Sequence, residues 1–204
     1  MSADCLWDEG VTWFSRRTVA PTELPMTTGY VTSQVLRVAN GTAEDGFVRA
    51  CIGAATDACE KDTGRALAPQ TWELILSRFP YGSRPIVIPR LPLITIDSVS
   101  YVDEDGVDQT LAGSPAEYVV IPSGEFQRAQ ITPLYDATWP ATRYQPQAVT
   151  ITFTCGYESN EYPETLLAGI GLLVGEMYKT RTLSADGQDR SQLQLSRFWR
   201  KVEG

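Results

Sequence analysis

Apolar residues recur with a helical period in the first third of the chain. A short helix is predicted to begin at the cap pair Thr32–Ser33 and to end at Asn40–Gly41. A second helix is predicted from a cap at Thr42 to Gly64, with apolar side chains spaced by four, three and four residues on one face. These face positions are Phe47, Cys51, Ala54 and Ala58. Because most of them are small, we expect this helix to pack closely against another helix.

The period changes to two after residue 69, which predicts strands. The clearest alternation runs from Val149 to Cys155, where apolar residues alternate with threonines. Asp105–Gly106 predicts a tight turn between strands at 94–102 and 107–111. Further short strands are predicted at 72–76, 86–88, 118–121 and 126–131. Short strands separated by prolines favour antiparallel sheets over βαβ units.

A helical period returns at Pro163, a residue suited to the first turn of a helix. The predicted apolar face contains Leu166, Leu167, Ile170, Leu173, Val174, Met177 and Tyr178. Gly171 and Gly175 lie inside this helix, where each costs about 1 kcal/mol relative to alanine. We therefore expect both glycines to lie in a close helix–helix contact, with the helix over residues 43–63 as the expected partner.

The C-terminal residues combine an apolar stripe with positive charge. Residues 182–189 form a predicted polar linker, and Ser191 caps a last amphipathic segment in which Leu195, Trp199 and Val202 share one face. Large apolar side chains rimmed by basic ones are typical of interface hot spots. We expect this segment to contact a protein partner, rather than to pack within the chain or to bind DNA. The predicted contact residues are Leu195, Arg197, Phe198, Trp199, Arg200 and Lys201.

This order of elements predicts an α+β fold, a small helical bundle with an inserted antiparallel β-sandwich or barrel-like block. The predicted domains are an N-terminal arm over 1–29, a bundle over 30–69 and 162–181, and a β domain over 70–161. Residues 182–204 complete the chain as a linker and a C-terminal arm helix. The N-terminal arm has no clean period, but its aromatic residues favour packing on a neighbour over disorder.

Composition excludes several classes of function. The 204 residues include no histidine, so Ser-His-Asp and Cys-His catalysis and histidine-ligated zinc are excluded. The four cysteines do not form a C-x-x-C pair, and we interpret them as small buried apolar residues. No apolar run is long enough to predict a membrane span. The sequence therefore predicts no catalytic residue, no metal and no cofactor.

The net charge is −8, which does not attract nucleic acid by bulk electrostatics. The charge is uneven, because residues 176–204 contain six basic and four acidic residues. The preceding part of the chain therefore carries a net −10.

Three other patterns could indicate a specific function, although we favour a structural interpretation of each. Asp103, Asp105 and Asp108 suggest calcium, but their spacing does not fit an EF-hand loop, and a solvated hairpin tip is favoured. The acids near aromatic residues that could serve a carboxylate hydrolase are Glu117, Glu125 and Asp136. The aromatic residues that could form a sugar-binding platform are Tyr135, Trp139 and Tyr144. A β-sandwich module that binds carbohydrate or protein therefore stays an alternative, and a carboxylate hydrolase stays a third.

Several segments together resemble one family, over roughly residues 30–181. These are VRACIGAATDACEKDTGR at 48–65, QTWEL at 70–74, IPRLPLITIDSVSYVDEDG at 88–106, VTITFTCGY at 149–157 and YPETLLAGIGLLVGEMYKTR at 162–181. In their order and spacing they resemble the head-to-tail connector (adaptor) proteins of long-tailed bacteriophages and related prophage particles. The first 29 residues and residues 182–204 fall outside the resemblance.

The resemblance implies a structural protein of the virion neck, assembled in the cytoplasm of the bacterial host, and no enzyme. It implies a homo-oligomeric ring, commonly of twelve subunits, beneath the portal protein. Such a ring extends the DNA channel, lets DNA pass without specific binding, and docks a stopper or tail-proximal neck protein. No membrane and no cofactor are implied.

Overall fold

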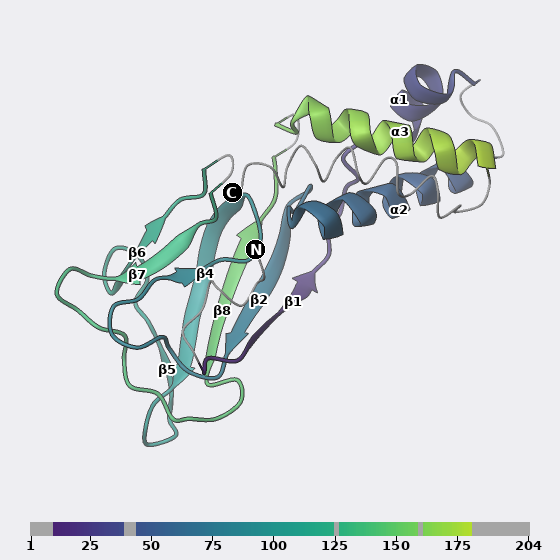
Figure 1. Cartoon of the computed structure of the whole chain (residues 1–204). Coiled ribbons are helices and arrows are strands. Elements are labelled where there is room, and N and C mark those ends of the chain that lie inside the picture. The colour runs from purple at the N-terminus through teal and green to yellow at the C-terminus, as the bar shows by residue number, and fades with distance from the viewer. Residues whose placement is uncertain (1–9, 39–43, 125–126, 159–160, 181–204) are drawn as a thin grey trace. The chain divides into compact units, whose positions relative to one another are not determined.

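The computed structural model describes residues 10–38, 44–124, 127–158 and 161–180 (Figure 1). The chain divides into two compact units, one of residues 1–20 and 69–156 and the other of residues 21–68 and 157–204. The first is a β unit with two antiparallel sheets, and the second is a helical unit. The predicted α+β class is confirmed. None of the helices in the described ranges is both long and apolar enough to cross a membrane.

The larger sheet of the β unit has five strands in the order β1-β2-β8-β4-β5 (Figure 1). Their bounds are Trp13–Val19 for β1, Gln70–Leu76 for β2, Val149–Cys155 for β8, Leu93–Val102 for β4 and Asp108–Thr110 for β5. The central strand β8 buries its four apolar side chains and leaves its threonines half-buried, as the alternating pattern predicts. This strand pairs with β2 and β4, so it forms the middle of the sheet.

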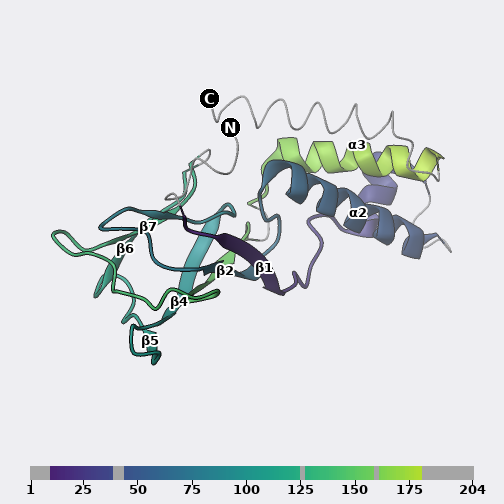
Figure 2. The ribbon, with the colours of Figure 1, turned by 60° about the horizontal axis from the view of Figure 1, so that its bottom comes forward.

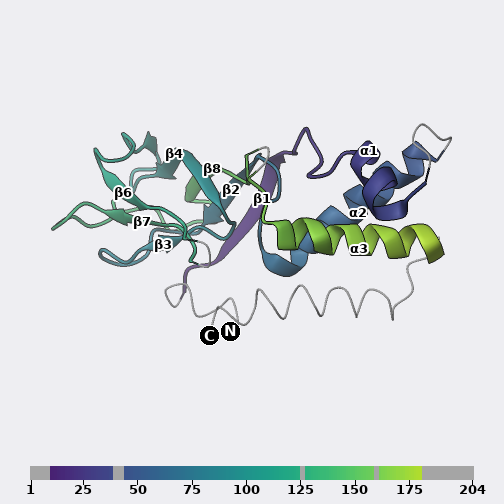
Figure 3. The ribbon, with the colours of Figure 1, turned by 90° about the horizontal axis from the view of Figure 1, so that it is seen from above.

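The smaller sheet has three strands in the order β3-β7-β6 (Figure 3). They are β3 (Ile86–Val87), β7 (Gln130–Pro133) and β6 (Tyr118–Ile121). The strand predicted at 126–131 instead begins at Gln130, and residues 125–126 lie outside the described part of the chain. The pairing accounts for the difference, because the ladders to β3 and to β6 both begin at Gln130 of β7.

Strand β1 corrects the prediction that residues 1–29 form an arm. Its residues pair antiparallel with β2, from Trp13 opposite Leu76 to Arg17 opposite Trp72. This edge strand is largely exposed on both faces, so its sequence lacks the alternation that a half-buried strand shows. Backbone hydrogen bonds to β2 hold it in place, and the exposed Arg16–Glu73 ion pair at 2.7 Å adds at most about 1 kcal/mol.

The helical unit begins with a short α-helix, α1 (Thr28–Tyr30), which continues as a π-helical turn, η2 (Val31–Leu36). The hydroxyl of Thr27 accepts a hydrogen bond from the Tyr30 backbone N–H at 3.2 Å, so the cap lies five residues before the predicted one. The turn ends at Arg37, whose φ of 55° is left-handed. The predicted stop at Asn40–Gly41 and the predicted cap at Thr42 lie outside the described residues.

Two longer helices, α2 (Asp45–Thr63) and α3 (Glu164–Thr180), lie side by side (Figures 1 and 3). The predicted face of α2 is wrong by about one position, because Ala54 is exposed and Phe47 is only partly covered. The apolar residues that α2 buries are Val48, Cys51, Ile52, Ala55 and Cys59. The longer side chains of Val48 and Ile52 bury more apolar area than the alanines of the predicted face, so they decide which way the helix turns.

The C-terminal end of α2 is held by a polar network. Gly64 adopts a φ of 68°, and its N–H donates to the Glu60 carbonyl at 3.0 Å. The buried carboxylate of Glu60 accepts a hydrogen bond from the Leu67 backbone N–H at 2.7 Å, and Arg65 donates to the Tyr157 hydroxyl. These bonds fix the segment that leaves α2 just before β2 begins. Residues 60–65 therefore have a structural role.

Candidate functional site

A groove runs along α3 in the helical unit and has a volume of about 1250 Å³. We call it the α3 groove. Residues before α2 form one wall, including Met26, Tyr30 and Val35, and α3 forms the other from Glu164 to Lys179. Tyr30 is 53% exposed and Leu172 is 65% exposed, so the groove presents large apolar side chains to solvent. The sequence pattern did not predict this groove. The one sequence feature that indicates it is Leu172, a large apolar residue that lies off the predicted apolar face of α3.

Gly171 and Gly175 line the α3 groove beside Val35 of η2. A Cβ added at Gly171 would lie 3.4 Å from Val35 Cγ2, and one added at Gly175 would lie 3.8 Å from Val35 Cγ1. The sequence pattern predicts α2 as the partner of these glycines. The structure instead places η2 against them, because α3 turns Leu166, Ile170 and Val174 to the buried side.

Replacing Gly171 by leucine is expected to lower the free energy of unfolding by about 1–3 kcal/mol. The atoms beyond Cβ would overlap Val35, which already lies in van der Waals contact with the Cβ position. The control is Gly171→Ala, which fits that contact and should raise the free energy of unfolding by about 0.4–1 kcal/mol through backbone entropy. Thermal unfolding measures both variants. An unchanged melting temperature for Gly171→Leu would show that this position faces solvent.

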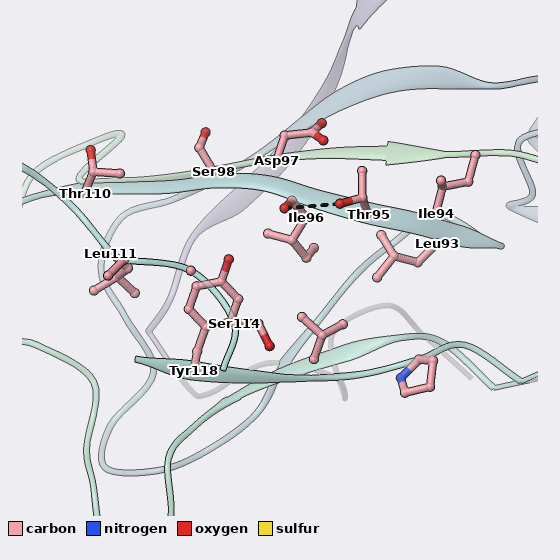
Figure 4. A pocket seen from close by; sticks show the side chains of 14 residues that line it. Leu93, Ile94, Thr95, Ile96, Asp97, Ser98, Thr110, Leu111, Ser114 and Tyr118 are labelled. Carbon is pink, nitrogen blue, oxygen red and sulfur yellow. Dashed lines mark hydrogen bonds between the residues drawn. The ribbon is translucent and has the colours of Figure 1, made fainter. Parts of the chain in front are cut away.

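The β unit contains a smaller pocket of about 550 Å³ between β4 and β6 (Figure 4). In Figure 4, Leu93 and Ile96 point from β4 toward the strand that carries Tyr118. Burial raises the pKa of the Tyr118 phenol above its ordinary value. The one carboxylate among the lining residues, Asp97, accepts a hydrogen bond from the Thr154 hydroxyl at 2.9 Å. The lining thus offers hydroxyl and apolar groups but no pair of titratable groups suited to acid–base catalysis.

The acids considered for hydrolysis have separate local roles where the structure describes them. The carboxylate of Glu117 accepts a hydrogen bond from the Ala112 backbone N–H, which closes the turn before β6. Asp136 follows β7 in a left-handed conformation with a φ of 60°. Glu125 lies outside the described residues. Within the described ranges, no three Cys, Asp or Glu side chains gather in a way that could hold a metal ion.

Asp103 organises the hairpin between β4 and β5. Its Oδ1 accepts hydrogen bonds from the backbone N–H groups of Val107 at 2.8 Å and Asp105 at 3.1 Å, and its Oδ2 accepts one from Gln109 at 2.9 Å. The Gln109 side chain, followed by the backbone donors, lowers the pKa of Asp103. The carboxylate is thus occupied by the turn itself, which agrees with the favoured hairpin tip.

Acidification is expected to loosen this hairpin before it affects the core. The folded pKa of Asp103 is lowered, so its contribution is present above the ordinary pKa of about 3.9 and is lost as pH falls through the lower folded value. Asp103→Ala should produce the same loosening at neutral pH, seen as faster amide exchange over residues 103–109. Asp105→Ala is the matched control, because the hairpin bond of Asp105 uses its backbone N–H. Equal exchange in both variants would refute this role.

Trp139 is a packing residue and does not present a sugar-binding face. It is 7% exposed, and its ring stacks on Phe79 at 5.0 Å with an interplanar angle of 4°. Its indole N–H donates to the Arg84 carbonyl at 2.8 Å. A platform needs an open ring face. Tyr135 and Tyr144 remain exposed, but a platform of the three rings would lack Trp139.

The cysteines are buried wherever the structure describes them, which confirms that prediction for Cys51, Cys59 and Cys155. Burial raises the pKa of the Cys59 thiol to about 12, and the neighbouring carboxylates of Glu60 and Asp62 act in the same direction. A thiol with such a pKa carries almost no thiolate at neutral pH and is chemically inert. Cys5 lies outside the described residues.

The predicted C-terminal contact residues all lie outside the described part of the chain, within residues 181–204. Their role as a partner contact therefore stays a prediction. The described helix α3 ends at Thr180, beside the groove-lining residue Lys179.

Comparison with solved structures identifies the fold. A chain from the neck of an empty GTA particle computed with C6 symmetry matches with a TM-score of 0.72 at 23% identity, over 89% of this chain and 94% of that one. A chain from the virion of a native gene transfer agent (GTA) particle matches with a TM-score of 0.73 at 22% identity, over 91% and 94%. A chain from the neck of a native GTA particle computed with C12 symmetry gives 0.64 at 21% identity, over 89% and 94%.

The protein therefore shares its fold, over nearly the whole length of both chains, with these chains of gene transfer agent particles. No protein-family model and no curated protein matches the sequence.

Proposed function

We propose that this chain is a structural component of the neck of a phage-like particle, where it serves as a head-to-tail adaptor. The observation that carries the proposal is a fold match that covers the β unit and the helical unit together. Two independent supports agree with it, the connector-like order of sequence segments and the absence of histidine, which removes the commonest catalytic groups. The proposed role is structural and not enzymatic.

In this proposal several copies form a closed ring beneath the portal and extend the DNA channel. Two of the matched necks were computed with C6 and C12 symmetry, and twelve copies is the number that the connector resemblance implies. The net charge of −8 per chain suits a channel through which DNA passes without sticking. The opposite faces of the ring would contact the portal and a stopper or tail-proximal neck protein.

The C-terminal segment is the proposed portal contact. Residues 191–202 combine Leu195, Phe198 and Trp199 with Arg197, Arg200 and Lys201. Basic side chains steer such a segment toward an acidic groove, and a buried tryptophan supplies hot-spot affinity. A polar linker of eight residues, 182–189, separates the segment from the end of α3 and gives it reach.

The experiment that tests the proposal is the size of the purified full-length protein, alone and with portal-bearing capsids. Native mass spectrometry or electron microscopy should show a ring, either of the protein alone or of the protein bound at the capsid vertex. A strict monomer that binds no capsid would contradict the proposal.

A carbohydrate-binding module is not favoured, because the indole of Trp139 is covered by Phe79 and bonded to Arg84. The contacts of Trp139 are equally compatible with a protein-binding β module and with an adaptor. The ring measurement distinguishes the two.

A further inference from the structure

We propose that in the free chain the α3 groove binds the chain's own C-terminal segment, residues 191–202. The inference concerns the protein before it meets any partner and does not depend on the proposed neck role. It rests on the shape of the groove, on the length of chain that follows α3, and on the side chains of that segment.

The groove presents apolar side chains to solvent. Gly171 and Gly175 line it beside Val35, which packs closely against both glycines. Leu172 and Tyr30 stand exposed on its two sides. The groove has a volume of about 1250 Å³, and most of its lining residues are apolar. A segment that covers it therefore removes apolar surface from water.

The C-terminal segment has a matching apolar stripe. Leu195, Trp199 and Val202 recur at helical spacing, with Phe198 beside them. As a helix, these twelve residues would extend about 18 Å. The groove-lining part of α3, from Glu164 to Lys179, rises about 23 Å, so the segment fits within its length.

The chain is long enough to bring the segment to the groove. Residue 180 ends α3 beside the groove, and residues 181–190 can span up to about 33–36 Å. Such a short tether holds the segment at a millimolar effective concentration. A contact too weak to be seen between separate molecules is therefore sufficient to keep the groove occupied.

Charge favours a return path antiparallel to α3. The charged residues that line the groove on α3 are Glu164 in the first turn, Lys179 in the last turn and Glu176 between them. An antiparallel path brings Arg200 and Lys201 toward Glu164 and leaves Asp189 toward Lys179. The opposite direction would place Arg200 and Lys201 near Lys179, where like charges repel.

Hydrogen–deuterium exchange of the full-length protein, read by mass spectrometry, tests the proposal. The amides of 191–202 should be protected in the unmodified chain and should exchange about tenfold faster or more in Leu172→Lys. Leu172 is exposed, so this substitution should leave the protection of α3 itself unchanged. The matched control is Ala54→Lys on the exposed side of α2, which should leave 191–202 protected.

Each other outcome overturns the proposal. Absent protection of 191–202 in the unmodified chain, or protection that survives Leu172→Lys, shows that the groove does not hold this segment. Release by Ala54→Lys places the segment on α2 instead. Protection that disappears on dilution, together with dissociation of a dimer, shows that the groove takes the segment of a second copy.

Discussion

Trp139→Ala is expected to lower the free energy of unfolding by about 3–5 kcal/mol, the cost of removing a buried tryptophan. The indole ring stacks on Phe79, which also packs edge-on against Tyr101 of β4 at 5.5 Å. The substitution also removes the donor to the Arg84 carbonyl. The loops after β2 and after β7 therefore lose their shared anchor. Denaturant unfolding of the two proteins measures the difference.

The matched control for Trp139 is Tyr135→Ala in the same loop. Tyr135 is 95% exposed, so its removal should change the free energy of unfolding by no more than about 0.5 kcal/mol. If Trp139→Ala were as mild as Tyr135→Ala, the stacked ring would not anchor the loop. That result would favour an exposed aromatic surface around residues 135–144 as a binding platform.

Trp199→Ala is expected to weaken attachment to portal-bearing capsids while residues 30–181 stay folded. A buried hot-spot tryptophan contributes about 2 kcal/mol or more, and repetition of the contact around a ring multiplies the effect through avidity. Co-sedimentation of the purified variant with capsids measures attachment, and circular dichroism checks that the protein is folded. Unchanged attachment would place the portal contact elsewhere, for example in the N-terminal aromatic residues.

Leu172→Lys is the informative control for Trp199→Ala. It removes the proposed resting place of the C-terminal segment without altering the segment, so attachment to capsids should be unchanged or stronger. A folding defect in Trp199→Ala would have a different meaning, because it would show that the segment belongs to the core. The two variants together distinguish binding of the C-terminal segment in the α3 groove from a role of Trp199 in the partner contact.

The strands that sequence could predict are those with one buried face. The residues from Val149 to Cys155 alternate because one face of β8 lies in the core and carries the apolar side chains, whereas the other face is half-buried and carries the threonines. Strand β1 gives no such signal, since both of its faces are largely exposed and its partner β2 lies more than fifty residues away. Local pattern carries no information about that pairing.

The helices show a similar division between local and tertiary control. The end of α2 at Gly64 is determined by local chemistry, because a glycine accepts the left-handed conformation at low cost. The sequence therefore predicts this end correctly. The buried face of α2 is not decided by the sequence pattern, because two neighbouring faces have apolar residues at the same spacing and the packing in the fold buries the one with Val48 and Ile52. The contact of Gly171 with Val35 joins residues more than 130 positions apart and depends on the tertiary fold.

In the candidate site, too, some features are set by local sequence and others by the tertiary fold. The turn at Asp103 was predictable from local chemistry, whereas the α3 groove depends on where η2 lies against α3. The C-terminal apolar stripe was visible in sequence, but the surface that receives it becomes apparent only from the fold.

The most direct test of the neck role is to locate the protein within particles purified from the cells that make them. Electron microscopy of particles labelled on this chain should place the label between the capsid vertex and the tail, in several copies around the axis. A label on the capsid surface or at the distal end of the tail, or its absence from assembled particles, would contradict the account.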